Sequence, residues 1–512
     1  MFWNKNNKPG WFGSKLDEYK STLQSGDYSA ISWIFCVFSE NHEASKTVAA
    51  KLLRAALDKL TFDELIRVDE QMRQTTSMEW SINWRNYSLD KFFTPQMGEP
   101  ERRAVIVFAS FNPNGFIREQ AMRLIKDYPC ALPFAVLRQN DWVAQIRSAA
   151  AETADYRLAH LSDGELVKAL PFADKLMRSG RANNGNTYIT RIYTALTANE
   201  RELLFGLDAA NIRTRRICTN ALLDSDNPRY DLAFGRLQYE TDPFLRAHVF
   251  RRLVSTGQNM DAVVDKFLQD KYPRNRALAF QYVCCTDKNK ATQAAKELLL
   301  DKSTIVREEV HFYLKKNAPD FDCRAYYKEH LIDCKAPAIY GLGETGKAED
   351  AAEIEDYLTS DVISVARAAI TTVMRLNGEK YAMVITGFLA DSHAGIVKTT
   401  HNLLMKTSLP DYDRIMEIFR STPYENTKQK CFSILLTAGK WQRLNYILEV
   451  LENSDSFMIE KAEYAINRWI WSYNRSYAVA GKDQIEKNIE SIRRLGGKLS
   501  AKTQRELFFL LR

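Results

Sequence analysis

Glycine and proline are scarce in this sequence. The 512 residues include only 21 Gly and 14 Pro, too few for collagen-like, low-complexity or turn-rich β structure. Apolar residues make up 45% of the chain and charged residues 26%, which is enough to bury a sizeable core. The composition therefore predicts a well-ordered, mainly helical protein, long enough for three or four ordinary domains or for one elongated array.

Long hydrophobic runs and a strong net charge are also missing. The apolar run ISWIFCVF, Ile31 to Phe38, is much shorter than the ~20 residues needed to cross a bilayer, and it follows a polar opening rather than a signal sequence. We expect no membrane span, no export and a cytoplasmic location. The net charge of +7 is a small difference between 71 basic and 64 acidic side chains, milder than in a dedicated nucleic-acid-binding protein.

Patterns typical of metal sites and of catalysis are missing as well. The eight cysteines are scattered, with no C-x-x-C pair and no histidine at zinc-ligand spacing, so we expect reduced thiols. The seven histidines are separate, and no serine lies in a G-x-S-x-G context. We expect no metal and no cofactor and favour a non-enzymatic protein, with an active site assembled from distant segments as the alternative.

One motif has the spacing of a dinucleotide-binding loop. Gly341, Gly343 and Gly346 form G-x-G-x-x-G, but the preceding residues HLIDCKAPAIY lack the buried β-strand that such a loop requires. Apolar residues recur at three- and four-residue steps on both sides, as in amphipathic helices. We therefore place the glycines between two helices. Gly343 and Gly346 fit positions that end a helix in the left-handed region or let a neighbouring helix approach.

A recurring pair of charged residues indicates an internal repeat. An aspartate is followed six positions later by an arginine in DWVAQIR, DKYPRNR, DKSTIVR and DVISVAR, and the arginines are 129, 31 and 60 positions apart, close to four, one and two repeats of about 31. A period of this length with helical patterning is typical of an α-solenoid. Weaker copies of the pattern fall near Arg118, Arg213, Arg246, Lys398, Lys428 and Glu460.

The stretch AIYGLGETGKAEDAAEIEDYLTSDVISVARAAI, Ala338 to Ile370, resembles nearly end to end one unit of the HEAT-repeat proteins, in particular of the short repeats named after phycobilisome lyases. FASFNPNGFIREQAMRLI resembles a first, variant unit, and the resemblance covers roughly residues 99 to 475. It implies an all-α, armadillo-like α-solenoid, a right-handed superhelix in which the Asp and Arg of successive repeats form a hydrogen-bonded ladder. The matching positions are Asp141, Arg147, Asp270, Arg276, Asp301, Arg307, Asp361 and Arg367. The resemblance implies no single activity.

Elementary packing arguments agree with a solenoid of about twelve two-helix repeats with helical caps. A pair of short helices cannot bury its apolar stripe alone, so each pair must pack on its neighbours. We expect each aspartate to cap the following helix and each arginine to bind a neighbouring acid or carbonyl.

The two ends of the chain are expected to differ from the repeats, because end repeats must cover an exposed apolar face. We predict an N-terminal helical cap in residues 1–98, a HEAT-like repeat array in residues 99–478 and C-terminal capping helices in residues 479–512. Thr61 and Glu64 match a capping box. The apolar residues 507–511 are either the buried face of the closing helix or a docking peptide.

Two groups of residues are candidates for partner contacts. The arginines of the first group fall at repeat spacing and would follow a phosphate backbone if they formed one stripe, although acids lie among them. The second group would anchor a peptide or stack on bases, or else form core. The candidates are Arg213, Arg215, Arg216, Arg246, Arg251 and Arg274 in the first group, and Trp469 and Trp471 in the second.

We therefore predict a non-enzymatic scaffold or adaptor that binds a protein or peptide partner along the concave face of the solenoid. The alternative is a DNA-binding protein or a HEAT-like DNA glycosylase that uses an Arg-rich concave groove. A lyase that attaches a chromophore follows only from the family's name and is the third hypothesis.

Overall fold

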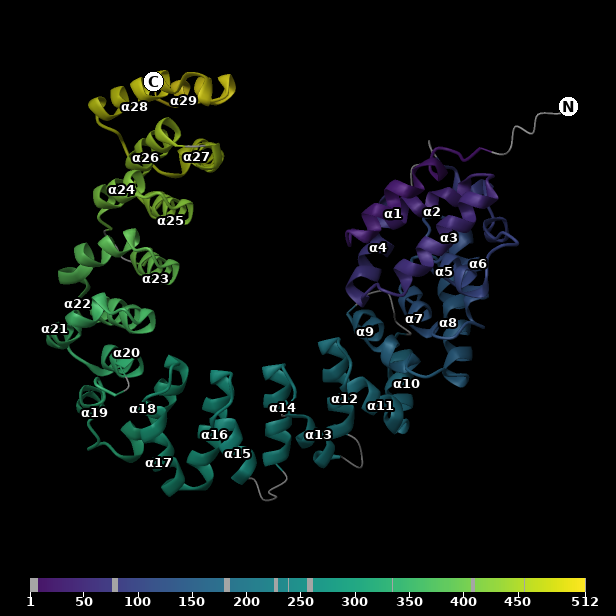
Figure 1. The fold of residues 1–512 in the computed structure, drawn as a ribbon, viewed down its shortest axis with the longest axis horizontal. Coiled ribbons are helices and arrows are strands. Elements are labelled where there is room, and N and C mark those ends of the chain that lie inside the picture. The colour runs from purple at the N-terminus through teal and green to yellow at the C-terminus, as the bar shows by residue number, and fades with distance from the viewer. Residues whose placement is uncertain are drawn as a thin grey trace. The chain divides into compact units, whose positions relative to one another are not determined.

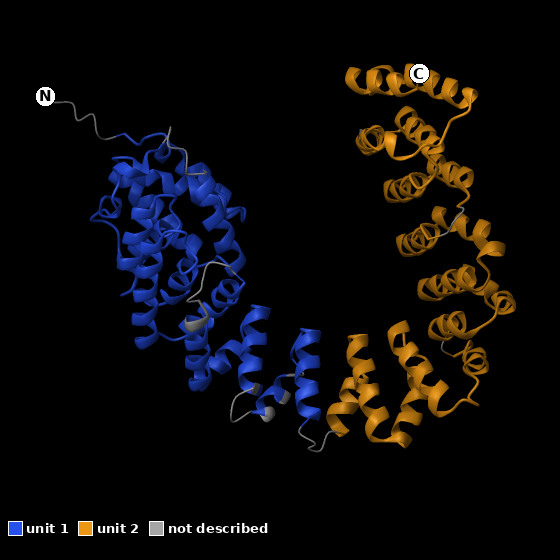
Figure 2. Ribbon diagram, turned by 180° about the vertical axis from the view of Figure 1, so that it is seen from behind, with its two compact units in different colours: residues 1–260 blue, residues 261–512 orange. Residues whose placement is uncertain are grey.

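Helices are the only regular secondary structure in the part of the chain that the computed structural model describes (Figure 1). That part comprises residues 8–75, 82–178, 185–224, 229–237, 239–255, 261–333, 335–406, 410–454 and 456–511. The chain divides into two compact units, unit 1 from residue 1 to 260 and unit 2 from residue 261 to 512 (Figure 2). The all-α class predicted from the sequence is confirmed.

Unit 1 contains α1 (Leu16–Gln24), α2 (Ala30–Cys36), α3 (Glu43–Leu57), α4 (Phe62–Thr75), α5 (Glu99–Ala109), α6 (Gly115–Ile125), α7 (Leu132–Arg138), α8 (Ala144–Ala159), α9 (Glu165–Met177), α10 (Gly185–Ala198), α11 (Glu200–Leu207), α12 (Ile212–Asp224), α13 (Tyr230–Leu237) and α14 (Pro243–Val254). Its 3₁₀ helices are η1 (Gly13–Lys15), η2 (Val37–Ser39), η3 (Trp84–Asn86) and η4 (Leu89–Phe92).

Unit 2 contains α15 (Asp261–Leu268), α16 (Pro273–Thr286), α17 (Lys288–Leu298), α18 (Thr304–Asn317), α19 (Cys323–Glu329), α20 (Lys335–Thr345), α21 (Ala351–Ile354), α22 (Ile363–Gly387), α23 (Ala394–Leu404), α24 (Tyr412–Ser421), α25 (Glu425–Leu435), α26 (Lys440–Asn453), α27 (Ser456–Trp471), α28 (Lys482–Leu495) and α29 (Ala501–Leu510). Its 3₁₀ helices are η5 (Ala348–Asp350), η6 (Glu355–Thr359), η7 (Phe388–Ala390), η8 (Tyr473–Arg475) and η9 (Gly496–Lys498).

Neighbouring helices pack as pairs from α5 to α27. Asn377 interrupts α22 with a non-helical backbone (φ −150°, ψ 65°), so α22 supplies the second helix of one pair and the first helix of the next. In the described residues this gives five pairs in unit 1 and seven in unit 2, twelve in all. The fold is therefore the helical-repeat solenoid that the sequence predicts.

The second helices of the pairs form a continuous row in each unit. In unit 1, α6, α8, α10, α12 and α14 contact one another in order, and in unit 2 the row is α16, α18, α20, α22, α23 and α25. Each of these helices contacts its own first helix and at least one neighbouring second helix, so its apolar residues are buried between repeats.

Helices outside the pairs cover one end of each unit. In unit 1, Thr61 and Glu64 form the predicted capping box before α4, with a distance of 2.8 Å from the Thr61 N–H to Glu64 Oε2. In unit 2, α28 contacts α26 and α29 contacts α27. Leu507 and Leu511 are buried in the core there, whereas Phe509 is exposed.

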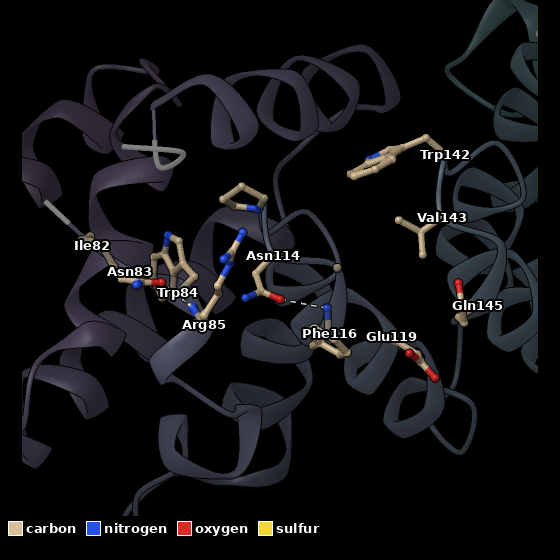
Figure 3. A pocket seen from close by; sticks show the side chains of 12 residues that line it. Ile82, Asn83, Trp84, Arg85, Asn114, Phe116, Glu119, Trp142, Val143 and Gln145 are labelled. Carbon is tan, nitrogen blue, oxygen red and sulfur yellow. Dashed lines mark hydrogen bonds between the residues drawn. The ribbon is translucent and has the colours of Figure 1, made fainter. Parts of the chain in front are cut away.

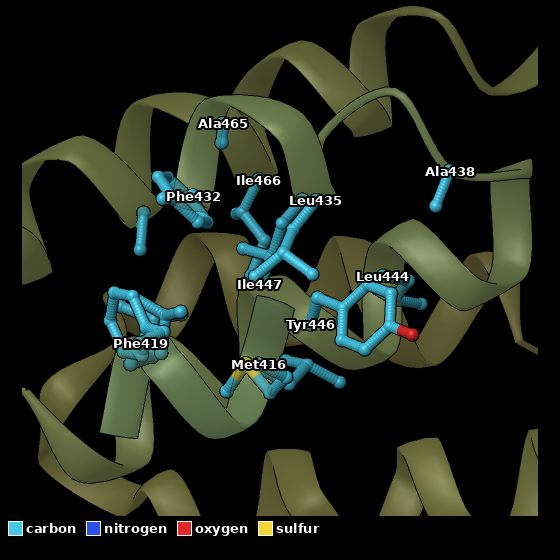
Figure 4. Close-up of a cluster of buried hydrophobic side chains, with 14 of the residues drawn as sticks. Met416, Phe419, Phe432, Leu435, Ala438, Leu444, Tyr446, Ile447, Ala465 and Ile466 are labelled. Atoms are coloured by element: carbon cyan, nitrogen blue, oxygen red, sulfur yellow. The ribbon is translucent and has the colours of Figure 1, made fainter. Parts of the chain in front are cut away.

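The core of unit 2 continues beneath its last helix pairs. Figure 4 shows Met416 and Phe419 of α24, Phe432 of α25, Ile447 of α26 and Ile466 of α27 converging on one cluster. All are nearly or fully buried. The last pairs therefore share a single apolar core, and a substitution in one helix affects the packing of its neighbours.

Two of the three glycines of the G-x-G-x-x-G motif serve close packing. Gly341 and Gly343 lie inside α20, where a Cβ would come within 2.1 Å of Tyr327 Cε1 and 2.7 Å of Thr372 Oγ1, respectively. Among the described glycines, a positive φ occurs at Gly26, Gly164 and Gly496. Gly341 and Gly343 therefore lie inside one helix and not between two helices, and the close approach of a neighbour explains them. Gly346 follows the last residue of α20, as expected of a helix end, but neither it nor Gly343 has the expected left-handed backbone.

Candidate functional site

Arginines join neighbouring helix pairs in a recurring geometry. The Nε and Nη2 groups of Arg118 donate to the two carboxylate oxygens of Asp141 at 2.9 and 3.0 Å. Arg276 binds Asp301 in the same way, at 2.7 and 2.6 Å. In each case the arginine lies on the second helix of one pair and the acid lies just before the second helix of the next. The two parallel bonds fix distance and orientation together.

The third nitrogen of these arginines anchors the arginine to its own repeat. Nη1 donates to the backbone carbonyl of the residue six positions earlier, at 2.6–2.9 Å, throughout the set. The donor–acceptor pairs are Arg118–Asn112, Arg147–Asp141, Arg215–Ala209, Arg246–Glu240, Arg276–Asp270 and Arg307–Asp301. Because every residue has a carbonyl, this position tolerates Asn, Ala and Glu. The repeat around residue 213 therefore centres on Arg215, and its assignment to Arg213 was wrong.

The aspartates of the motif stabilise the turn before the helix. The side chains of Asp141, Asp270 and Asp301 each accept the N–H two residues on, at 3.1, 2.7 and 2.8 Å. The helices that follow have Val143, Tyr272 and Ser303 as N-caps, without a side-chain cap bond. The expected capping of the helix by these aspartates is therefore wrong, because each carboxylate accepts the N–H of the N-cap residue itself and not an N–H of the first helical turn.

Three of the predicted ladder positions lie in other arrangements. Arg307 binds Glu344, at the end of α20, with Nε at 2.9 Å and Nη2 at 2.5 Å. Asp361 is exposed, and Arg367 donates to Thr399 Oγ1 at 2.8 Å. The motif DVISVAR therefore has the sequence of the ladder without its Arg–carboxylate bridge in the described residues.

The bridge between Arg118 and Asp141 is the most buried of these pairs, with side-chain exposures of 1% and 0%. Burial alone would raise the pKa of Asp141, but the hydrogen bonds and charge of Arg118 and the charge of Arg138 outweigh it, so the pKa lies below its usual range. Arg138 in turn pairs with Asp69 at 2.6 Å. The aspartate is therefore an ionised structural partner.

Half of the predicted arginine stripe is engaged in contacts within the protein. Arg215 binds Glu240 with two bonds of 3.0 Å, Arg216 Nε lies 2.5 Å from Asp242 Oδ2, and Arg246 donates to two backbone carbonyls. Arg213 and Arg251 are exposed in unit 1, and Arg274 is exposed in unit 2. A phosphate backbone would have to compete with carboxylates for Arg215 and Arg216 and with backbone carbonyls for Arg246.

A hollow in unit 1 presents two large aromatic side chains that the sequence did not single out (Figure 3). Its volume is about 550 Å³, and it lies between η3 and the starts of α6 and α8. Phe116 is 74% exposed and Trp142 65% exposed, whereas Trp84, which also lines the hollow, is buried. The Arg118 guanidinium lies 5.9 Å from the Trp142 ring centroid, so the ladder supports this side chain. We call this site the aromatic hollow.

The predicted pair of tryptophans separates into one core residue and one surface residue. The Trp469 indole N–H donates to the Lys440 carbonyl at 2.8 Å, and its ring packs against Trp441 and Tyr473. Trp471 is 70% exposed, with the Arg475 guanidinium 3.8 Å from its ring centroid. Two residues apart on a helix point to nearly opposite sides, so one side chain packs inward and the other faces solvent.

No cluster of three or more His, Cys, Asp or Glu is placed to hold a metal ion in the described residues. Burial raises the pKa of the Cys36, Cys218 and Cys431 thiols to about 12, the reverse of an activated thiolate. Cys334 lies outside the described residues. None of the described helices is long and apolar enough for a bilayer span.

A partly buried histidine predicts a pH dependence of stability. His311 Nε2 lies 2.8 Å from the hydroxyl of Tyr327. Burial lowers the pKa of His311, the charge of Glu344 opposes this, and the charges of Arg307 and Arg375 lower it further. The folded state thus holds the neutral imidazole, so its stabilisation is complete above the unfolded pKa of about 6.5 and is lost as pH falls towards the lower folded pKa.

We expect the His311→Gln variant to lose less stability than the wild type between pH 7 and pH 5. Urea denaturation at a series of pH values measures this difference. His160→Gln changes an exposed histidine and should follow the wild-type profile. Parallel profiles for wild type and His311→Gln would contradict the prediction.

Comparisons with known proteins add little to this geometry. No family model matches the sequence, and no curated protein matches it. Two crystal structures of Kap121p mutants were found among solved structures, with 12% and 13% identity and TM-scores of 0.20 and 0.19. They match 98% of this chain and 55% and 54% of their own length, so the chain spans about half the length of these structures. The order and packing of its own helices show that the chain is an all-α helical-repeat solenoid.

Proposed function

We propose that this protein is a non-enzymatic scaffold that binds a protein or peptide partner through exposed side chains beside its second helices. The aromatic hollow is the observation that carries the proposal. Phe116 and Trp142 lie at the starts of two successive second helices, α6 and α8, and both expose most of their surface to solvent. Large exposed aromatic side chains on a rigid support are typical of the residues that contribute most to protein interfaces.

The support beneath these rings favours binding without rearrangement. Arg118 and Asp141 join the turns that carry Phe116 and Trp142, and Asn114 Oδ1 accepts the Phe116 N–H at 2.8 Å. A preorganised site loses little conformational entropy when a partner binds. The hollow would accept an apolar side chain of the partner between the two rings.

A retention experiment tests this proposal. The purified protein is used to capture partners from its native lysate, and the bound proteins are identified by mass spectrometry. We expect specific partners of the wild type to be lost from the Phe116→Ala/Trp142→Ala variant. Phe312→Ala, which removes a similarly exposed ring from α18, is the control and should retain them. The same bound proteins in wild type and double variant would contradict the proposal.

The alternative of a DNA-binding protein or glycosylase makes a different prediction in the same preparation. Duplex or single-stranded DNA would be retained at low salt and released with a steep log–log dependence on salt concentration. Such a result would favour the alternative over the scaffold. The concave binding face, the short-repeat family assignment, the absence of cofactors and the cytoplasmic location stay predictions from the sequence.

A further inference from the structure

Six side chains along α27 and η8 alternate between aromatic and basic. They are Phe457, Lys461, Tyr464, Arg468, Trp471 and Arg475, spaced by four, three, four, three and four residues. This spacing places residues on one side of a helix. All six are exposed, including 66% of Tyr464 and 70% of Trp471. We call this row the α27 stripe.

The basic side chains of the α27 stripe are available to a partner. In the described part of the chain, Lys461, Arg468 and Arg475 form no ion pair with a carboxylate. Lys461 Nζ instead lies 4.8 Å from the ring centroid of Phe457, and the Arg475 guanidinium lies over Trp471. Arg276 and Arg307 in the same unit are by contrast held by acids. The stripe thus combines positive charge with exposed apolar surface.

The stripe borders a groove between α25 and α27. Two adjoining hollows of about 530 and about 280 Å³ share Leu436, Ala465 and Arg468 in their walls. The buried ring of Phe432 contributes to the apolar floor, and Figure 4 shows it above the core of this region. Four basic side chains line the two hollows and only one acidic side chain does. The groove is therefore apolar at its base and positive at its rim.

We propose that the α27 stripe binds an acidic amphipathic helix of a partner protein. Its aromatic residues recur every seven positions, about 10.5 Å along the helix axis. A partner helix with an apolar residue every seven positions has the same repeat, so each ring can meet one apolar side chain. Acidic residues of the partner then face Lys461, Arg468 and Arg475, which gives electrostatic complementarity.

The same spacing disfavours nucleic acid as the occupant. Successive bases of one strand are about 3.4 Å apart along a duplex, whereas the rings of the stripe lie about 10.5 Å apart with a basic side chain between each two. They do not form a continuous platform for stacked bases. The inference names a partner class for the proposed scaffold function, but it concerns a different surface from the aromatic hollow.

Fluorescence polarisation with designed peptides tests the inference on the full chain. The probe is a labelled helical peptide of three heptads with leucine at every seventh position and glutamates beside it. One comparison peptide replaces the glutamates with lysine, a second replaces the leucines with alanine, and a single-stranded DNA oligonucleotide serves as a competitor. We expect the acidic leucine peptide to bind at least tenfold more tightly than either comparison peptide, and DNA not to displace it.

Variants then locate the binding surface. Arg468→Glu and Trp471→Ala should each weaken binding of the acidic peptide by about tenfold or more, and circular dichroism should show both folded because both side chains are exposed. Arg493→Glu, on the exposed side of α28, is the charge-matched control and should leave binding within about twofold. In the Arg468→Glu/Arg475→Glu variant, the lysine peptide should bind more tightly than the glutamate peptide.

Several results would overturn the inference. These are equal binding of the acidic and basic peptides, unchanged binding by Arg468→Glu, or displacement of the peptide by DNA. The Phe116→Ala/Trp142→Ala variant should bind the peptide as the wild type does. Failure of the peptide experiment, with lysate partners still dependent on Phe116 and Trp142, would contradict this inference alone and leave the proposed scaffold function standing.

Discussion

Replacing Asp141 with alanine lowers the free energy of unfolding by about 3–5 kcal/mol, the cost typical of breaking a buried ion pair by removing one partner. Asp141 accepts two hydrogen bonds from Arg118 and one from the Val143 N–H. Without the carboxylate, the guanidinium of Arg118 stays buried with its charge unbalanced. Urea denaturation followed by far-UV circular dichroism measures the change.

Aspartate-to-alanine substitutions at two other motif positions should lower the free energy of unfolding by less, in the order of their burial and bridging. Asp301→Ala removes the acceptor of the less buried Arg276 and should cost about 1–3 kcal/mol. Asp361→Ala removes an exposed side chain and should stay within about 0.5 kcal/mol of the wild type. Asp361 thus serves as a matched control with the same sequence motif. Equal losses at all three positions would show that burial and bridging do not set the effect.

Replacing Gly341 with alanine destabilises the fold by about 1–3 kcal/mol through overpacking. The new methyl group would lie 2.1 Å from Cε1 and 2.2 Å from Cζ of Tyr327. That ring is fully buried and its hydroxyl contacts His311, so it has little room to withdraw. The loss exceeds the gain in helix propensity of about 1 kcal/mol that alanine brings, and thermal or urea denaturation measures the balance.

A second glycine provides the control for this prediction. Gly387 has helical dihedrals (φ −58°, ψ −31°) and no atom within 4 Å of a built Cβ. Gly387→Ala should therefore stabilise the protein by about 0.4–1 kcal/mol. In a Tyr327→Ala background, Gly341→Ala should lose most of its cost, because the clashing ring is gone. A destabilisation that persists in that background would contradict the packing explanation.

The repeat was predictable from the sequence because the Asp and Arg recur at the period of the helix pair. The acid position of the ladder was only partly predictable. Its carboxylate accepts hydrogen bonds from the arginine of the preceding repeat, whereas its backbone carbonyl accepts one from the arginine six residues later. Because every residue has a carbonyl, the residue type does not reveal the second contact. The Asp–Arg spacing therefore does not mark Ala209 or Glu240, and it does mark Asp361, which forms no such bridge in the described residues.

The surfaces offered to partners were harder to predict. The aromatic hollow brings Trp84 close to Phe116 and Trp142, and no local pattern joins segments so far apart in sequence. In the α27 stripe the alternation of rings and cations is visible in the sequence, but it is equally typical of a half-buried helix. Contacts of α27 with α26 and of Trp469 with Trp441 determine which side of α27 is core.

A double-mutant cycle on Arg276 and Asp301 tests most directly whether arginine–carboxylate bridges join the repeats. The free energy of unfolding is measured for wild type, Arg276→Ala, Asp301→Ala and the double variant. The bridge predicts a coupling energy of about 1–3 kcal/mol, within the range found for residues in direct contact. Additive losses, with a coupling energy within about 0.3 kcal/mol of zero, would contradict it.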